Sequence, residues 1–410
     1  MSIMLIAAIV SMEALVVPGG VSAAAQPAAD ESRTIEASFS QRSYRPGDVA
    51  HLSVVSSMRG TTLRVFRSGP PALRARRNDT MSGVPVSDTI ESVSRRIALK
   101  VGDWPTGLYF ARLDGPSGKL GFAPFVVRPR RLGESRVAVV LPTNTWQAYN
   151  FRDVDRDGVG DTWYADSRIR SVDLTRPFLH RGVPPHFRGY DQAFLWWLAL
   201  HGKHADVLTD DDFERVHSGA HLARLYDLVV FPGHEEYVSA HMYDVVQSYR
   251  NGGGNLVFLS GNNFYYRVER RGIRLYKIGH WSDLGRTGES LSGLVYVGWS
   301  KNHFPNRPYV VTGARTAPWL FRGTGFRNGA RWGVYGIEID QRGPHSPHGI
   351  IVLARIANAF GPGRSAEMTY YTTARGAKVF SAGVMNFGGS ALFPTVSIML
   401  ENLWARASAP

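Results

Sequence analysis

Alternating apolar and polar positions mark the first third of the chain. A period of two puts every second side chain on the same face of a strand, so each alternating run predicts a half-buried strand. The alternating runs lie at 49–55, 62–66, 94–99, 107–113 and 121–127. Turns containing Pro and Gly separate these runs, and short strands joined by such turns indicate an all-β sandwich.

The pattern changes after residues 129–133, which we interpret as a linker. Continuous apolar runs then predict strands buried on both faces, and segments with helical periodicity lie between them. The predicted strands are 137–141, 205–208, 225–231, 255–260 and 378–384, and the predicted helices are 191–202, 240–250 and 395–405. Alternation of strands and helices with short loops predicts a doubly wound parallel sheet.

These patterns predict two domains behind an N-terminal segment. The segment spans residues 1–30, the β-sandwich residues 31–129 and the α/β domain residues 135–407. The stretch Trp104-Pro105-Thr106-Gly107-Leu108-Tyr109 resembles a strand entry common in immunoglobulin-like modules of exported proteins. We therefore expect an all-β immunoglobulin-like sandwich, followed by an α/β, doubly wound domain.

Composition excludes several kinds of chemistry. The 410 residues contain no Cys, so disulfides, thiolate metal sites and a cysteine nucleophile are ruled out. The formal net charge is +13, but the basic residues are scattered apart from short clusters at 74–77, 128–131 and 267–271. No nucleic-acid-binding motif accompanies them. We therefore expect no specific nucleic acid partner. The positive charge instead favours an anionic envelope surface as a partner.

The N-terminal segment has the pattern of a secretory signal peptide. Residues 1–10 are apolar, and the small-residue stretch at 21–27 contains an A-x-A-like cleavage site near Ala23 to Ala25. Two features depart from the usual pattern, because no Lys or Arg precedes the apolar run and Glu13 interrupts it. A misplaced start codon would explain the first departure. We predict an exported protein, in the periplasm, cell envelope or extracellular space.

The turn Phe231-Pro232-Gly233-His234-Glu235-Glu236-Tyr237 follows a predicted strand and precedes a predicted helix. In open α/β sheets, ligands bind at the carboxyl ends of the strands. The turn therefore brings a His and two carboxylates to the edge where chemistry is expected. The alternative is that His234 and Glu236 are solvated loop residues or anions favoured at a helix start. The local pattern alone does not separate these interpretations.

Four spaced motifs carry a family resemblance. They are Pro142-Thr143-Asn144-Thr145-Trp146-Gln147-Ala148-Tyr149-Asn150, Thr175-Arg176-Pro177-Phe178, Gly233-His234-Glu235-Glu236-Tyr237 and Leu259-Ser260-Gly261-Asn262-Asn263-Phe264-Tyr265-Tyr266. Together they resemble the catalytic C-terminal region of the N,N-dimethylformamidase large (beta) subunit, over roughly residues 135–407. The resemblance implies a sheet similar to that of class I glutamine amidotransferases, although this chain lacks their Cys nucleophile.

The resemblance also implies a mononuclear iron held by two Tyr and one Glu. Carried over to this chain, the ligands are Tyr149, Tyr190 and Glu236. His234 and Asn262 match polar residues around the metal, and Glu338 in Gly336-Ile337-Glu338-Ile339-Asp340 corresponds to a later family Glu. Two phenolates and a carboxylate are hard donors, which suit Fe³⁺ better than zinc.

In this interpretation each polar group has a role. Open positions on the metal would hold a water and polarise an amide carbonyl. His234 would transfer the proton between water and the leaving amine, and Asn262 would hydrogen-bond the oxyanion. No H-E-x-x-H, G-x-S-x-G or phosphate-binding glycine motif offers a different catalytic reading.

A second metal-like pattern follows Tyr149. Asp153, Asp155, Asp157 and Asp161 alternate with other residues around Gly158, as in the first part of a calcium loop. Position twelve is Tyr164 rather than the Glu of an EF-hand. A calcium site and an ion-free Asp/Gly turn both remain open.

The sequence thus predicts metal-assisted hydrolysis of a C–N amide bond in a formamide or another small-molecule amide. A small subunit or a homo-oligomer would be the further partner. The alternative is an exported envelope protein without catalysis, which binds a carbohydrate or protein or is stabilised by calcium.

Overall fold

The computed structural model describes residues 33–55, 59–70 and 79–409. The predicted signal peptide at 1–30 and the basic cluster at 74–77 lie outside these residues. Within the described ranges, every helix is too short or too polar to cross a bilayer.

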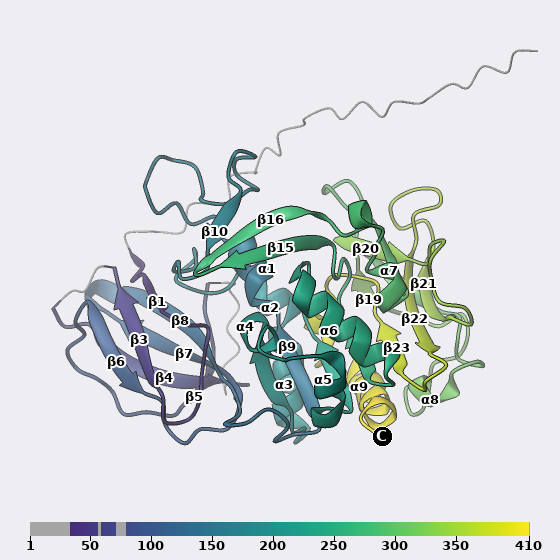
Figure 1. Ribbon diagram of the computed structural model, residues 1–410, viewed down its shortest axis with the longest axis horizontal. Helices are drawn as coiled ribbons and strands as arrows, with labels where there is room; N and C mark the ends of the chain where they lie inside the picture. Colours follow the sequence, from purple (N-terminus) through teal and green to yellow (C-terminus); the bar gives the residue numbers. More distant parts are fainter. Residues whose placement is uncertain (1–32, 56–58, 71–78, 410) are drawn as a thin grey trace, which may run out of the picture.

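Two sheets form the N-terminal part of the structure (Figure 1, purple and blue). The three-stranded sheet contains, in spatial order, β1 (Ala37–Phe39), β3 (Val49–Val54) and β6 (Arg96–Lys100). The five-stranded sheet contains β2 (Ser43–Tyr44), β8 (Leu120–Val127), β7 (Gly107–Asp114), β4 (Thr62–Ser68) and β5 (Gly83–Pro85). All five strands predicted from alternation are therefore present, as β3, β4, β6, β7 and β8.

The alternation has the predicted physical cause. In β3, Ala50, Leu52 and Val54 are buried, whereas the residues between them are exposed. The buried residues belong to a hydrophobic core shared by both N-terminal sheets. The other face of the five-stranded sheet contributes Phe110 and Phe122 to the core of the C-terminal part. The immunoglobulin-like classification and the domain boundaries stay predictions.

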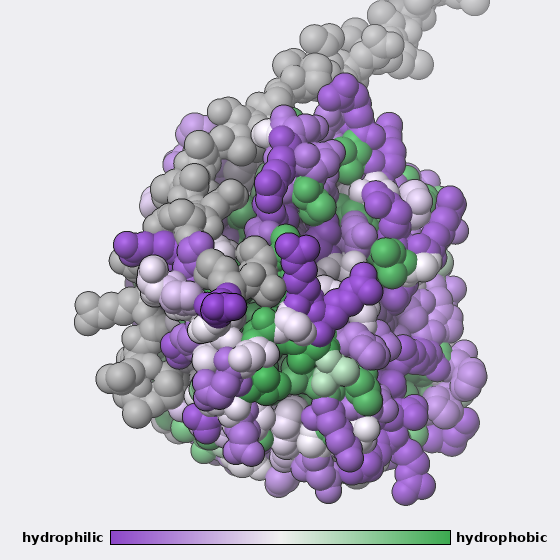
Figure 2. All heavy atoms as spheres, turned by 90° about the vertical axis from the view of Figure 1, so that its left-hand side faces the viewer, coloured by the Kyte–Doolittle hydropathy of each residue, from purple (hydrophilic) through white to green (hydrophobic). Residues whose placement is uncertain are grey.

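The outer face of these sheets is mostly hydrophilic. Figure 2 shows hydrophilic side chains over most of this side of the molecule, with hydrophobic side chains gathered near its centre. This surface agrees with the many scattered basic residues of the sequence. Binding to an anionic envelope surface stays a prediction.

A nine-stranded sheet forms the centre of the C-terminal part. In spatial order its strands are β11 (Asp206–Thr209), β9 (Val137–Leu141), β12 (Leu228–Phe231), β14 (Asn255–Phe258), β23 (Lys378–Ser381), β22 (Ala366–Thr372), β21 (Ile351–Ile356), β18 (Arg307–Val311) and β19 (Arg331–Tyr335). The first five strands are parallel and the others join antiparallel. Every residue of β9, β11, β12 and β14 is buried, as parallel strands covered on both faces require.

Helices pack on the parallel strands. The core on one face includes residues of α3 (Gln192–Leu200) and α9 (Pro394–Ala407), and the core on the other includes residues of α5 (Gly219–Leu225) and α6 (Ala240–Asn251). The Ser239 hydroxyl caps α6 by accepting the Met242 N–H at 3.0 Å. The shorter helices are α1 (Thr143–Ala148), α2 (Phe187–Tyr190), α4 (Asp210–Phe213), α7 (Glu289–Ser292) and α8 (Pro318–Phe321).

Two smaller sheets complete the described structure. One has the spatial order β10 (Ser171–Asp173), β16 (Arg274–His280), β15 (Tyr266–Arg271) and β13 (Tyr237–Ser239). The other pairs β17 (Val295–Trp299) with β20 (Glu338–Gln341). In Figure 1 the β15–β16 hairpin crosses over α1 and α2.

The predicted doubly wound α/β fold, similar to class I glutamine amidotransferases, is wrong. Strands hold 32% of the residues and helices 20%, and the strands of the described part form five sheets. The alternation of strands and helices at 137–258 does not continue through the following part of the chain. Residues 266–384 contribute mainly strands, and four of these continue the central sheet in the antiparallel direction. Three of these four strands, β18, β19 and β21, are only partly buried and lack the continuous apolar runs that identified the parallel ones.

Candidate active site

The candidate site begins at the turn after β12. The side chains of His234 and Glu236 are almost fully buried, with 5% and 2% of each residue exposed. The alternative that they are solvated loop residues is therefore wrong. Glu235, between them, is fully buried, and burial and the neighbouring Asp210 carboxylate raise its pKa well above its usual value.

Three elements hold Glu236. The Thr145 hydroxyl of α1 accepts the backbone N–H of Glu236 at 3.2 Å. The Asn262 side-chain amide donates to Oε1 at 3.3 Å, and the Tyr164 hydroxyl donates to Oε2 at 3.3 Å. The turn after β12, the loop after β14 and the segment after α1 therefore meet at this carboxyl group.

Asn262 joins two acids. Its side-chain amide also donates to Oε2 of Glu338, the first residue of β20, at 2.7 Å. Its backbone N–H lies 2.9 Å from both carboxylate oxygens of Asp340. Asn262 has a φ of +53° and Ile337, directly before Glu338, has a φ of +69°. Left-handed backbone at a β-branched residue is strained, and such strain concentrates at functional sites.

His234 lies between the two acids. Its Nε2 is 3.6 Å from Oε2 of Glu236 and 3.7 Å from Oε2 of Glu338. Among the described residues, Nε2 has no hydrogen-bond partner. Burial, and to a lesser extent the charge of His186, lower the pKa of His234 to about 3. The imidazole is therefore neutral at pH 7.

The acids themselves favour a cation. Burial raises the pKa of Glu236 to about 8, although the Tyr149 and Tyr164 hydroxyls partly offset this effect. Burial and the charge of Glu236 raise the pKa of Glu338 well above its usual value. Two buried acids next to a neutral imidazole are costly to ionise unless a positive charge accompanies them. The donor atoms therefore fit a metal cation.

Tyrosines border this cluster. The Tyr149 ring lies 4.5 Å from the Tyr164 ring and 5.6 Å from the His234 ring, measured between centroids. Burial and the charges of Glu236 and Glu338 raise the pKa of Tyr149 well above its usual value. A phenol in these surroundings ionises only beside a strong cation.

Tyr190 reaches the site from α2. Its ring stacks on His186 at 5.2 Å, and burial followed by the charge of Glu338 raises its pKa. A small pocket lies between the two predicted tyrosine ligands, with a volume of about 10 Å³ that fits roughly one water. Its lining residues are Thr145, Trp146, Tyr149, Pro185, His186, Tyr190, Asp191 and His234.

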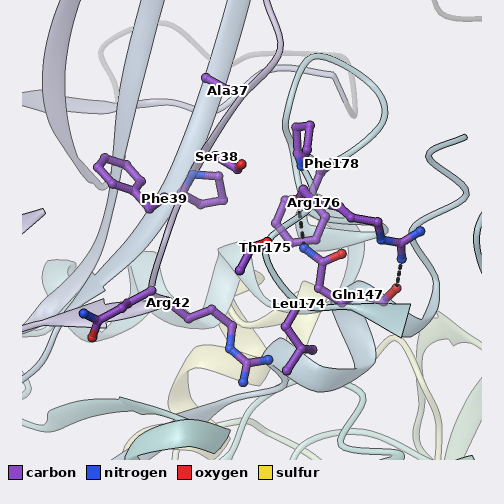
Figure 3. Close-up of a pocket in the computed structure, with 12 residues that line it drawn as sticks. Ala37, Ser38, Phe39, Arg42, Gln147, Leu174, Thr175, Arg176 and Phe178 are labelled. Atoms are coloured by element: carbon purple, nitrogen blue, oxygen red, sulfur yellow. Dashed lines mark hydrogen bonds between the residues drawn. The ribbon is translucent and has the colours of Figure 1, made fainter. Parts of the chain in front are cut away.

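The second sequence motif, at 175–178, holds the first. The Arg176 guanidinium donates to the carbonyls of Gln147 at 2.9 Å and Asp161 at 2.7 Å, and the Gln147 amide donates to the Arg176 carbonyl at 2.9 Å. Figure 3 shows the two bonds between Arg176 and Gln147 beside a pocket whose other side is β1. These hydrogen bonds, which we call the Arg176 clamp, fix the end of α1 and thereby position Tyr149. Arg176 therefore contributes to the site by positioning other residues.

Close backbone packing places Tyr190. A Cβ on Gly388 would lie 2.6 Å from the Tyr190 carbonyl and 2.5 Å from the Pro232 carbonyl. A Cβ on Gly389 would lie 1.8 Å from the Gly189 carbonyl. Only glycine permits this approach, which joins α2 to the turn that carries His234.

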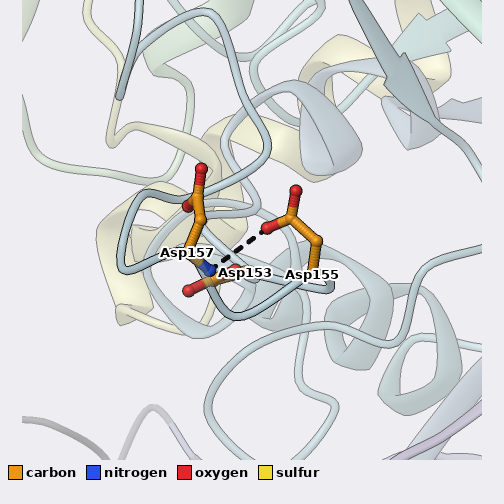
Figure 4. Close-up of side chains that lie close together, drawn as sticks. All are labelled: Asp153, Asp155 and Asp157. Atoms are coloured by element: carbon orange, nitrogen blue, oxygen red, sulfur yellow. Dashed lines mark hydrogen bonds between the residues drawn. The ribbon is translucent and has the colours of Figure 1, made fainter.

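The Asp-rich loop lies apart from this cluster. Carboxylate oxygens of Asp153, Asp155 and Asp157 lie within 4.8 Å of one another (Figure 4). Asp161 is not part of the group; its carboxylate accepts the Val154 N–H at 2.7 Å. Three converging carboxylates suit calcium, but exposed acidic groups are also common in ion-free turns. Both alternatives stay open.

Three residues of the site were missed in the sequence. Tyr164 stands at position twelve of the Asp-rich loop, yet its hydroxyl bonds Glu236 and the Tyr237 hydroxyl. Tyr237 closes the predicted motif, and Asp340 lies two residues after Glu338. The available signal for these three residues was that each lies in or next to a recognised sequence motif. Nothing in the spacing predicted that they would contact Glu236 or Asn262.

Comparisons with solved structures give only weak likenesses. A superoxide reductase (neelaredoxin) E23A from Ignicoccus hospitalis is 9% identical, covers 24% of this chain and 84% of its own, and has a TM-score of 0.18. The mmIFT52 N-terminal domain is 10% identical, covers 52% and 88%, and has a TM-score of 0.31. These likenesses are too weak to bear on fold or function. A search of curated proteins found no match.

A family model gives a clear result. Residues 92–394 match the N,N-dimethylformamidase beta subunit-like, C-terminal family, which confirms the resemblance carried by the four motifs. The match begins before β6, so it includes strands predicted to belong to the N-terminal sandwich. It spans well over half of the chain. This protein therefore belongs to the N,N-dimethylformamidase beta subunit-like, C-terminal family.

Proposed function

We propose that this protein is a metal-dependent hydrolase of C–N amide bonds, with a mononuclear iron held by Tyr149, Tyr190 and Glu236. Family membership supports amide hydrolysis in general terms. One observation carries the finer proposal. Glu236, Glu338 and His234 are brought together in a buried cluster, and the charge of Lys277 offsets only part of the effect of burial on the pKa of Glu236.

The donor atoms favour iron. Two phenol oxygens and a carboxylate are hard ligands with up to three negative charges, which match Fe³⁺. Tyr149 and Tyr190 have raised pKa values, so a weakly acidic cation would leave them protonated. When bound, the iron supplies a Lewis acid that polarises the amide carbonyl.

The residues around the ligands supply proton transfer. The neutral His234 accepts a proton from the attacking water and delivers it to the leaving amine nitrogen, so that amide and water become acid and amine. The Glu338 carboxyl group, 3.7 Å from Nε2, stabilises the imidazolium that forms during this transfer.

We propose a role for Asn262 that differs from the one predicted. Its side-chain amide donates to both Glu236 and Glu338. These bonds occupy the N–H groups that an oxyanion would need. We therefore propose that Asn262 positions the two acids.

Several parts of the proposal rest on the sequence. The substrate is a small-molecule amide, and the site's small pocket favours compact reacting groups. An exported location, a small subunit or homo-oligomer and calcium in the Asp-rich loop stay predictions.

The test is elemental analysis with a visible absorption spectrum, on wild type and Tyr149→Phe. We expect near-stoichiometric iron and a phenolate-to-iron band that Tyr149→Phe weakens or shifts. Tyr276→Phe, which alters a tyrosine on β16 beside Arg271, serves as the matched control and should leave the band unchanged. Absence of iron after iron-replete expression would contradict the proposal and favour the non-catalytic ligand-binding alternative.

A further inference from the structure

Two aromatic residues lie opposite Glu338 and Asp340, two acids of the site, in a short antiparallel strand pair. In the antiparallel β17–β20 pair, Trp299 is the register partner of Glu338, and Tyr296 is the partner of Asp340. Opposite residues of an antiparallel pair project from the same face, with Cβ atoms roughly 4.5–5.5 Å apart. Trp299 and Tyr296 therefore lie on the side of this small sheet that carries Glu338 and Asp340.

Trp299 is unusually open to solvent. It exposes 43% of its surface, whereas tryptophan is highly buried on average. The Lys301 ammonium lies 5.7 Å from its ring centroid. A large apolar ring beside a polar cluster leaves an area whose burial would be favourable. Packing within the protein therefore leaves much of this ring uncovered.

A third ring extends the face. The centroid of Tyr265 lies 5.1 Å from that of Tyr296, and Tyr265 follows the Asn262 loop in sequence. Both tyrosines are partly buried. Burial raises the pKa of each, and the charges of Glu236 and Glu338 add to the effect. Both rings are therefore within electrostatic reach of the acids.

We propose that Trp299, Tyr296 and Tyr265 form a subsite for an aromatic substituent of the amide substrate. This inference rests on the proposed function, since the reacting amide would lie at the neighbouring acids. Ring faces and edges attract another aromatic ring in stacked or edge-to-face geometry. Lys301 already supplies a cation beside Trp299, which disfavours a cationic substituent. N,N-dimethylformamide has no group to fill such a subsite.

The test compares two formamides of similar size. Formanilide carries an aromatic ring, and N-cyclohexylformamide carries a saturated one. Their dissociation constants are measured on the full-length, iron-loaded protein by ligand-observed NMR, alongside the rates of amine release. We expect formanilide to bind more tightly, and Trp299→Ala to weaken its binding by about tenfold, near the upper range for an aromatic pair. Trp299→Phe should retain most of the affinity.

The matched control is Val49→Ala, which truncates an apolar residue of β3 that is 49% exposed. It should leave both constants unchanged. Equal affinities for the two formamides, or no effect of Trp299→Ala, would overturn the subsite even if hydrolysis is observed. Trp299-dependent binding of formanilide without amine release would support the subsite and contradict the hydrolase instead.

Discussion

Replacing Asn262 separates the energetic contribution of its side chain from that of its backbone. The side chain donates two hydrogen bonds to buried acids, at 3.3 Å to Glu236 and 2.7 Å to Glu338. Each such bond contributes about 1 kcal/mol net. Asn262→Gly removes both without steric strain, because glycine adopts the φ of +53° readily. We expect it to lower the free energy of unfolding by about 2 kcal/mol.

Asn262→Ala should cost more than Asn262→Gly. Alanine loses the same hydrogen bonds and also carries a left-handed backbone penalty of about 1–2 kcal/mol. The expected total is about 3–4 kcal/mol, which corresponds to a fall in melting temperature of roughly 3–5 °C in a chain of 410 residues. Urea unfolding of the purified full-length variants, followed by circular dichroism, measures both changes.

Asn302 offers a matched control, because it is exposed and has a φ of +60°. At Asn302 the Ala variant should again be less stable than the Gly variant, but Asn302→Gly should be near wild type. If Asn262→Gly is as stable as wild type, the two hydrogen bonds contribute nothing. If Ala and Gly are equivalent at both positions, the backbone reasoning is refuted.

Two further predictions concern the site and the pH dependence of stability. Tyr164→Phe removes the hydroxyl beside Glu236, so iron affinity in a chelator competition should fall by about tenfold or more, whereas Tyr276→Phe should not change it. Burial raises the pKa of Glu367, but hydrogen bonds from Arg342 outweigh this and lower it overall. The ionised carboxylate therefore stabilises the fold above the unfolded pKa of about 4.3, and this contribution is lost as pH falls through the lower folded pKa. Glu367→Gln should lower stability at pH 7 but have little effect near pH 3; an equal loss at both pH values would contradict the assignment.

The local pattern determined many of the elements. The apolar runs at 137–141 and 255–260 identified β9 and β14, because strands buried on both faces need nearly continuous apolar residues. The position of His234 and Glu236 directly after a buried strand also predicted that they would lie at the carboxyl end of the parallel strands. That placement follows from the local pattern alone.

The tertiary structure decided the rest. Glu338 is more than 100 residues from Glu236, and only the pairing of β17 with β20 and the loop after β14 bring it to Asn262. Tyr164 reaches Glu236 because the Arg176 clamp folds the segment after α1 back onto the site. The mostly β architecture likewise depended on long-range strand pairing. Periodicity reports which face of an element is buried, but not which distant element covers it.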